Sequence, residues 1–181
     1  MLGEAHYDSG IHQLEEDMIK LVMPEYLLHE LLDIRYYDPR TKEVSFLRFT
    51  PDGKHYTPIN REDVVCKQEL HRHFVEWAEK YGLFLVGMDL SDAEHDITGE
   101  EIRSRKPHYQ LTNQSPEECV YRERRQGERM VEYANKTSKP LIAIMGADHR
   151  RPKSGIHPIL QRNGIQYVCI DLTRKSRTDG R

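Results

Sequence analysis

The 181-residue sequence lacks the features that would assign it to a membrane, an oxidising compartment or a nucleic-acid complex. No apolar run approaches the length of a membrane-spanning helix, and the charged start leaves no room for the apolar part of a signal peptide. The three cysteines are far apart and form no Cys-x-x-Cys pair, which favours free thiols in a reducing compartment. The net charge of −3 implies no general attraction to nucleic acid or to anionic membranes. We therefore expect a cytoplasmic protein with no nucleic-acid or membrane partner.

The composition is that of a soluble globular domain, with 31% charged and 37% hydrophobic residues. The length supports one core rather than two, so we expect a single α/β domain over 1–172 and a disordered basic tail over 173–181. Strand-like and helix-like segments alternate, which predicts a mostly parallel central β-sheet flanked by helices. Leu2 is the only apolar residue before Gly3 apart from Met1. The first strand is thus expected to be either a stub or the end of a strand that begins upstream.

Local patterns predict the individual elements. Helices are expected over 9–22, 60–81, 115–135 and 155–162, with Gly82 and Gly164 as end signals. Buried strands are expected over 26–32, 83–90, 141–145 and 166–170. Residues 35–59 are interpreted as a β-hairpin insertion that pairs Val44–Phe49 with His55–Thr57, and the hairpin edge at 43–57 offers a surface for a homodimer. The polar stretch 91–115 is long enough to form a functional lid.

Two Gly-x-x-His turns, Gly3 to His6 and Gly146 to His149, give the strongest chemical signal in the sequence. Each follows a segment predicted to be a strand. In an open parallel sheet, ligands bind in the crevice beyond the carboxyl ends of the strands. We therefore predict that the two strands lie side by side with aligned ends, so that both histidines enter one site.

Acidic residues are expected at the same edge of the sheet. Glu4 is two residues before His6, so both side chains point the same way in extended backbone. Glu30 and Asp89 end two further apolar runs. Together these groups could hold a divalent metal through His6, His149 and Glu30, or act without metal as general acid and base. Mutual repulsion of the acids should raise at least one carboxyl pKa. His12, about one turn into the first helix, is a candidate for a further ligand.

An arginine-rich helix offers positive charge. Arg122, Arg125 and Arg129 are spaced i, i+3 and i+7 and share one face, which could neutralise the acids or hold an oxyanion. The alternative is a solvated helix in which these arginines pair with neighbouring glutamates, namely Glu123, Glu128 and Glu132. The remaining histidines are interpreted as surface or loop residues without a partner at defined spacing: His71, His73, His95, His108 and His157.

These motifs, in this order, resemble the Tiki/TraB superfamily, which includes ChaN-like haem-binding proteins and erythromycin esterases. Leu2-Gly3-Glu4-Ala5-His6 is similar to the first motif of the family, and Ile144 to His149 followed by Gly155-Ile156 to the second. Leu28 to Leu31 resembles the glutamate element, Gly87 to Leu90 the next strand end, and Arg122 to Met130 the arginine helix. The 35–59 insertion, the short first strand and the 91–115 stretch depart from the family pattern.

The resemblance implies an α/β fold with its site at the strand ends. Its members include a metal-dependent protease, a metal-independent esterase type and haem binders, so three functions remain open. The first is hydrolysis of an amide or ester bond in a small-molecule or peptide substrate by Glu4, His6, Glu30 and His149, with manganese, cobalt or zinc as the metal if there is one. The second is binding of haem or another planar cofactor through His6, His12 or His149. The third is an inactive domain.

Overall fold

The computed structural model describes residues 2–4, 9–32, 35–50, 53–60, 72–88, 116–146 and 154–171. The helices are α1 (Ser9–Val22), α3 (Arg72–Tyr81), α5 (Pro116–Ala134) and α6 (Ile156–Arg162), with a 3₁₀ turn, η1, at Glu30–Leu32. The strands are β1 (Leu2–Glu4), β2 (Tyr26–His29), β3 (Arg35–Asp38), β4 (Glu43–Thr50), β5 (Gly53–Asn60), β6 (Phe84–Gly87), β7 (Ile142–Gly146) and β8 (Ile170–Asp171). Among these residues, no helix combines the length and apolar composition needed to cross a membrane.

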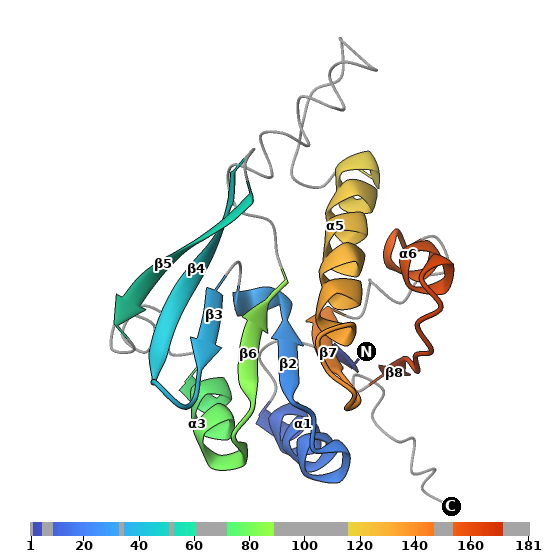
Figure 1. Ribbon diagram of the computed structural model, residues 1–181. Helices are drawn as coiled ribbons and strands as arrows, with labels where there is room; N and C mark the ends of the chain where they lie inside the picture. Colours follow the sequence, from blue (N-terminus) through green and yellow to red (C-terminus); the bar gives the residue numbers. More distant parts are fainter. Residues whose placement is uncertain are drawn as a thin grey trace, which may run out of the picture.

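All described strands join one mixed sheet in the order β5-β4-β3-β6-β2-β7-β1-β8 (Figure 1). The five strands from β6 to β8 in this order are mutually parallel. Strand β3 pairs antiparallel with both β6 and β4, and β4 pairs antiparallel with β5. The predicted α/β architecture with a mostly parallel core is confirmed. Strand β5 forms one edge of the sheet, as expected for the hairpin partner. That this hairpin is an insertion, and that it mediates a homodimer, stay predictions.

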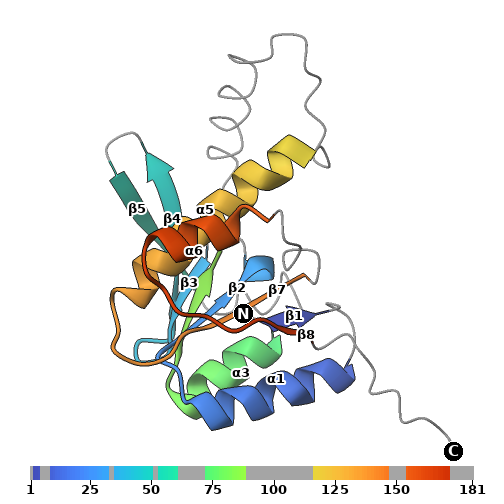
Figure 2. The ribbon, with the colours of Figure 1, turned by 90° about the vertical axis from the view of Figure 1, so that its right-hand side faces the viewer.

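Helices cover both faces of the sheet. Figure 2 shows α1 and α3 side by side on one face, with α5 and α6 on the other. The buried strand residues alternate between the two helical layers because successive side chains of a strand point to opposite faces. Leu27 and Ile144 pack in the α1–α3 layer, while Leu28 and Met145 pack in the α5–α6 layer. The near-continuous apolar runs of the sequence thus fill two cores, one on each face.

Several predicted boundaries hold. The first helix spans Ser9–Val22 as expected, and Pro24 follows it. Gly82 and Gly164 have φ values of +67° and +68°, the left-handed conformation that glycine adopts without strain at a helix end. The strand expected over 141–145 is observed at Ile142–Gly146.

Other boundaries were wrong. Asn60 does not begin a helix, because it is the last residue of β5 and lies opposite Glu43. The second strand ends at His29 rather than at residue 32, since the chain turns into η1. Of the strand expected over 166–170, only Ile170 pairs, together with Asp171. These two residues lie opposite Leu2 and Gly3 of β1 in parallel register.

Candidate metal centre

Three side chains of metal-ligand type converge between α1 and α3. His12 and Glu15 come from α1 and His73 from α3, and one ligand atom of each lies within 4.8 Å of the other two. Tetrahedral coordination with bonds of about 2.1 Å places ligand atoms roughly 3.5 Å apart, so a small closure of these side chains would bring them to one ion. We call these three residues the His–Glu–His group.

The two α1 ligands share one face of that helix because they are three residues apart. Glu15 lies between Ile11 and Ile19 in the buried stripe of α1 and is completely shielded from solvent. Burial of a carboxylate requires compensating positive charge or hydrogen bonds. The two imidazoles beside it, or a cation held by all three side chains, would supply that compensation.

Aromatic packing fixes the orientation of the imidazole rings. The rings of His12 and His73 stack with centroids 4.0 Å apart and an interplanar angle of 24°. Both rings also lie in T-shaped geometry with the ring of Trp77, with centroid distances of 6.5 Å for His12 and 4.8 Å for His73. The ring of Phe74 packs against two imidazoles. Its centroid lies 3.9 Å from that of His73 and 4.2 Å from that of His29, the last residue of β2. The group is therefore joined through side-chain contacts to the end of a central strand.

Chain connectivity places the His–Glu–His group at the carboxyl edge of the parallel strands. Helix α1 begins shortly after β1 ends, and α3 leads through Gly82 into the start of β6, so both helices run back along the sheet. Their first turns, which carry His12 and His73, consequently lie toward the strand ends. This is the edge at which open parallel sheets bind their ligands.

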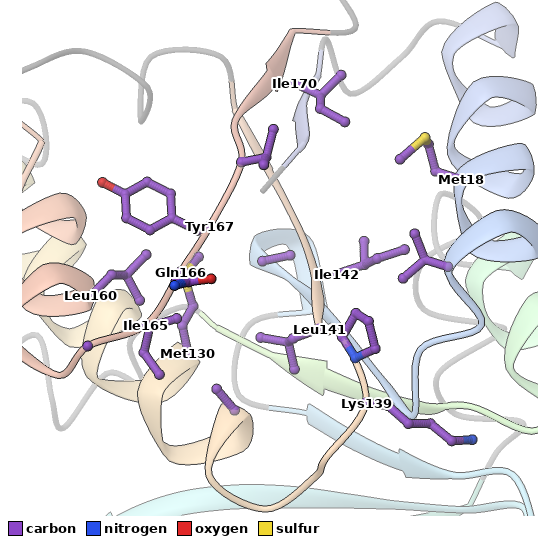
Figure 3. A pocket seen from close by; sticks show the side chains of 16 residues that line it. Met18, Met130, Lys139, Leu141, Ile142, Leu160, Ile165, Gln166, Tyr167 and Ile170 are labelled. Atoms are coloured by element: carbon purple, nitrogen blue, oxygen red, sulfur yellow. The ribbon is translucent and has the colours of Figure 1, made fainter.

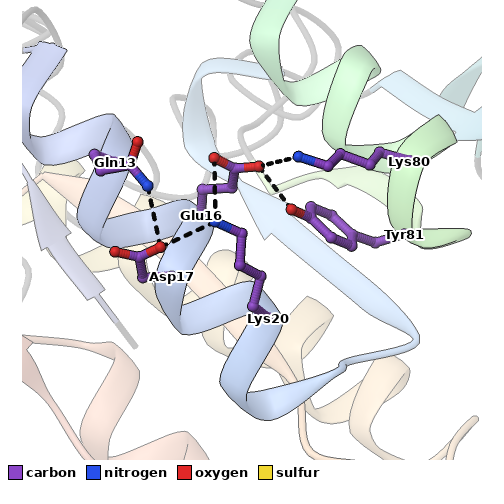
Figure 4. Close-up of polar contacts among 6 residues, drawn as sticks. All are labelled: Gln13, Glu16, Asp17, Lys20, Lys80 and Tyr81. Carbon is purple, nitrogen blue, oxygen red and sulfur yellow. Dashed lines mark hydrogen bonds and ion pairs between the residues drawn. The ribbon is translucent and has the colours of Figure 1, made fainter.

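Polar contacts outside the group hold the two helices together (Figure 4). The Glu16 carboxylate accepts hydrogen bonds from Lys80 Nζ at 2.8 Å and from the Tyr81 hydroxyl at 2.6 Å. These bonds, that from Lys80 first, lower the pKa of Glu16 from 4.5 to about 2. On α1, Lys20 also contacts Glu16 at 3.6 Å and Asp17 at 3.1 Å. Through Glu16, which follows Glu15, this network links α1 to α3 next to the His–Glu–His group.

The predicted pairing of the first strand with the strand before His149 is confirmed. Leu2, Gly3 and Glu4 lie opposite Ile144, Met145 and Gly146 in parallel register. The carboxyl ends of β1 and β7 are thus aligned. The predicted site residues His6, Asp89 and His149 lie outside the described residues, and Glu4 is placed by its backbone in β1. Convergence of these side chains stays a prediction.

Glu30 immediately follows β2 as the first residue of η1, and only 7% of it is exposed. Its neighbour His29 is fully buried. A carboxylate buried at the end of a central strand agrees with the predicted placement of Glu30. Its roles in catalysis and in metal binding stay predictions.

The arginine helix is divided between two environments. Arg125 pairs with Glu128 at 2.9 Å, and Arg124 contacts the same carboxylate at 3.2 Å, as the solvated-helix alternative predicts. Arg129 is buried instead and donates to the Gly87 carbonyl at the end of β6, at 3.3 Å. Arg122 is half-buried. Arg129 therefore contacts a strand end, while the site roles predicted for Arg122 and Arg125 stay predictions.

Sequence reasoning missed two members of the His–Glu–His group. Placing His73 among the partnerless histidines was wrong, because it stacks on His12. His157 was also misassigned, since its Nδ1 lies 2.9 Å from the Tyr167 hydroxyl. Glu15 was overlooked although the i, i+4 spacing of Ile11, Glu15 and Ile19 places a carboxylate on a potential apolar face.

A competing apolar stripe hid that signal. The apolar spacing that predicted the first helix ran through Ile11, Leu14, Met18, Leu21 and Val22, yet Leu14 and Leu21 are 49% and 78% exposed. The buried face of α1 is rotated away from them toward Ile11 and Ile19. Both stripes have helical spacing, so periodicity identified the helix without identifying its buried face.

Comparisons of the chain with protein-family models, with curated proteins and with solved structures give no match. The resemblance to the Tiki/TraB superfamily thus stays a prediction from the sequence motifs. Two imidazoles and a carboxylate are ligands suited to zinc, cobalt or manganese, and three protein ligands leave a coordination position for water or substrate.

Proposed function

We propose that the protein binds a divalent transition-metal ion through His12, Glu15 and His73 and hydrolyses an amide or ester bond beside it. The observation that carries the proposal is the convergence of the three donors within 4.8 Å at the carboxyl edge of a parallel sheet. A bound ion of this kind lowers the pKa of a coordinated water to near 7 and polarises a substrate carbonyl. The metal ligands proposed here replace the set His6, His149 and Glu30 as the first choice.

The other polar groups of this edge have separate roles in the proposal. Glu30 or Glu4 would accept the proton of the attacking water, and the protonated imidazole of His6 or His149 would give its proton to the leaving group. An arginine of α5 would stabilise the negative charge that develops on the carbonyl oxygen. Arg129 supports this last role because it already reaches the end of β6. The substrate class is a small molecule or peptide with an amide or ester bond.

The metal centre is tested by titrating chelator-treated protein with zinc, cobalt and manganese chloride in a calorimeter. We expect His12→Ala, Glu15→Gln and His73→Ala each to weaken binding of the preferred ion at least 100-fold with the circular dichroism spectrum unchanged. His157→Ala is the matched control, because His157 is also half-buried but belongs to the α5–α6 layer.

Parallel measurements separate this site from the alternatives. Wild-type affinity for the metal ion in all three variants would exclude the His–Glu–His group as the metal site. Loss of metal binding in His6→Ala or His149→Ala alone would favour the ligands first predicted from the motifs. Turnover of a chromogenic ester that survives loss of the metal would show a metal-independent hydrolase. A Soret absorbance band upon haem addition, lost in His12→Ala, would indicate the haem-binding function instead.

A further inference from the structure

The buried side chains of α5 change from apolar to polar along the helix. Toward its carboxyl end the helix buries Met130 and Tyr133, which belong to the core on this face of the sheet. Toward its amino end it buries three polar side chains, those of Glu123, Gln126 and Arg129. Helix α5 precedes β7 and runs back along the sheet, so its amino end extends past the carboxyl ends of the parallel strands (Figure 1). The polar part of α5 therefore lies at the edge of the sheet where ligands bind.

Two of these polar side chains have a partner within the fold. Glu123 accepts the Gly155 N–H at 2.8 Å, and Arg129 donates to the Gly87 carbonyl at 3.3 Å. Gln126 is completely shielded from solvent, yet neither its amide nitrogen nor its amide oxygen has a hydrogen-bond partner among the described residues. A glutamine amide carries two N–H donors and an acceptor oxygen. Burial of an unpaired amide destabilises a fold, which marks Gln126 as a side chain with a partner outside the fold.

A large cavity near the carboxyl end of α5 does not account for Gln126. The cavity has a volume of about 740 Å³ and lies between Ile142 and Tyr167 (Figure 3). Met130 lines it from α5, one helical turn from Gln126. The walls of the cavity are mostly apolar, and Gln126 does not line it. The partner of the Gln126 amide therefore belongs to a different place, at the carboxyl edge of the sheet.

Gln126 lies on a face of α5 that begins at the protein surface. Arg122, four residues before Gln126, shares this face and is half-buried, and Arg129 follows three residues after it. Movement of the long Arg122 side chain would thus open a path to the Gln126 amide. At 1.5 Å per residue, Gln126 stands about 4.5 Å beyond Arg129 along the helix axis. Since Arg129 reaches the end of β6, Gln126 lies just past the strand ends.

We propose that Gln126 binds a peptide group of a peptide substrate, donating from Nε2 to its carbonyl oxygen and accepting its N–H at Oε1. The inference rests on the proposed function and narrows the substrate class to peptides. The His–Glu–His group belongs to the α1–α3 layer and Gln126 to the α5–α6 layer, so a substrate that meets both must cross the strand ends. An extended peptide spans such a distance and presents a carbonyl and an N–H at each residue except proline. An ester in place of this peptide group would leave Oε1 unpaired, and the site should reject it.

Thermal unfolding of the metal-free protein tests whether the amide is unpaired when no substrate is bound. Gln126→Met keeps the length of the side chain and removes its hydrogen-bonding groups, so the melting temperature should rise by about 2–4 °C. Gln161→Met, at an exposed position of α6, is the matched control and should leave the melting temperature unchanged. A fall or no change in Gln126→Met would show that the amide is already satisfied within the fold and would overturn the proposal.

Nuclear magnetic resonance tests the chemical class of the ligand. The probes are N-methylacetamide, which has the groups of one peptide bond, and methyl acetate, in which an ester oxygen replaces the N–H. The side-chain NH₂ signal of Gln126, assigned by its absence in Gln126→Met, should shift saturably with N-methylacetamide and stay in place with methyl acetate. The NH₂ signal of the exposed Gln161 reports the effect of the solvent alone. No shift of the Gln126 signal, or the same shift with both probes, would overturn the proposal.

Hydrolysis of fluorescein-labelled casein separates this proposal from the metal centre. We expect Gln126→Met to lower kcat/KM for casein at least tenfold while it still binds the metal ion in the calorimeter. His12→Ala should lose both casein turnover and metal binding. Wild-type casein turnover by Gln126→Met would overturn the role of Gln126 and leave the metal centre standing. Binding of N-methylacetamide at Gln126 without any casein hydrolysis by the wild type would refute the proposed hydrolysis and support peptide binding by Gln126.

Discussion

The two faces of the sheet are covered by helix pairs that contact each other in opposite ways. Between α1 and α3 the contacts are made by long side chains, through the stacked rings of His12 and His73 and the bonds of Glu16 to Lys80 and Tyr81. Functional side chains can be placed in such an interface because the backbones stand apart. The His–Glu–His group is an example.

Between α5 and α6 the backbones approach closely at glycines. A Cβ at Gly155 would lie 2.5 Å from the Val120 carbonyl oxygen, a distance that real Cβ atoms essentially never show. The Gly155 N–H also donates to the buried Glu123 carboxylate at 2.8 Å. A Cβ at Gly127 would lie 3.2 Å from the Cβ of Ile159. The two layers should therefore respond to opposite substitutions, truncation on one face and enlargement on the other.

Truncation of Phe74 should have the largest effect. Phe74 is 1% exposed and contacts His29, His73 and Trp77. Phe74→Ala leaves a cavity, so we expect the free energy of unfolding to fall by about 3–5 kcal/mol. Urea titration at unchanged m-value measures this change. Phe74→Leu, which keeps most of the volume, is the control and should lose much less. A loss below about 1 kcal/mol in Phe74→Ala would show that aromatic packing does not hold α3 in place.

Enlargement at Gly155 should have the next largest effect. Gly155→Ala forces α5 and α6 apart, because the clash is with backbone rather than with a flexible side chain. Overpacking of this kind lowers the free energy of unfolding by about 1–3 kcal/mol. Gly127→Ala is the matched control at the same interface. There the tight contact opposes the gain of about 1 kcal/mol from the helix propensity of alanine, so the net change should be small. Equal losses in the two urea titrations would refute close backbone approach at Gly155.

Removal of the charge on Glu16 should have the smallest effect, because its partners lie near the surface. A lowered pKa means that the ionised group stabilises the fold fully above its ordinary pKa of 4.5, and that this contribution disappears as the pH falls to about 2. The melting temperature of Glu16→Gln should therefore lie slightly below that of the metal-free wild type at pH 6 and converge with it between pH 4.5 and 2. Glu76→Gln, which removes the exposed partner of Arg72, is the matched control measured over the same pH range. A constant difference across this pH range would contradict the assigned pKa.

The amount that could be predicted from the sequence differed between elements and contacts. The limits of α1 and the positions of Gly82 and Gly164 followed from short-range patterns, since capping, helix termination and apolar spacing act over a few residues. Pairing of β1 with β7 was predicted from two similar turns. That prediction was confirmed because the carboxyl ends of neighbouring parallel strands lie at one edge of a sheet.

Contacts between elements could not be read in the same way. His73 follows the start of a helix whose first residue was misplaced, and no local pattern indicates which histidine it meets. The buried face of α1 was also ambiguous, because Leu14 and Glu15 each belong to a stripe with helical spacing. Strand β8 pairs through Ile170 with Leu2 at the other end of the chain, a partner that no local pattern indicates. In each case a residue's surroundings depend on a segment far away in the chain.

The sequence by itself determined the alternation of strands and helices, the two-sided burial of the central strands and the presence of histidines and acids near their ends. Local backbone preferences and hydrophobic spacing are sufficient for these features. Only the tertiary structure decided that His12, Glu15 and His73 converge and that Ile142 and Tyr167 line one apolar cavity. Packing of segments that are distant in the sequence sets the distances between these side chains. Burial of apolar surface stabilises any close-fitting arrangement, and local patterns in the sequence do not specify which arrangement forms.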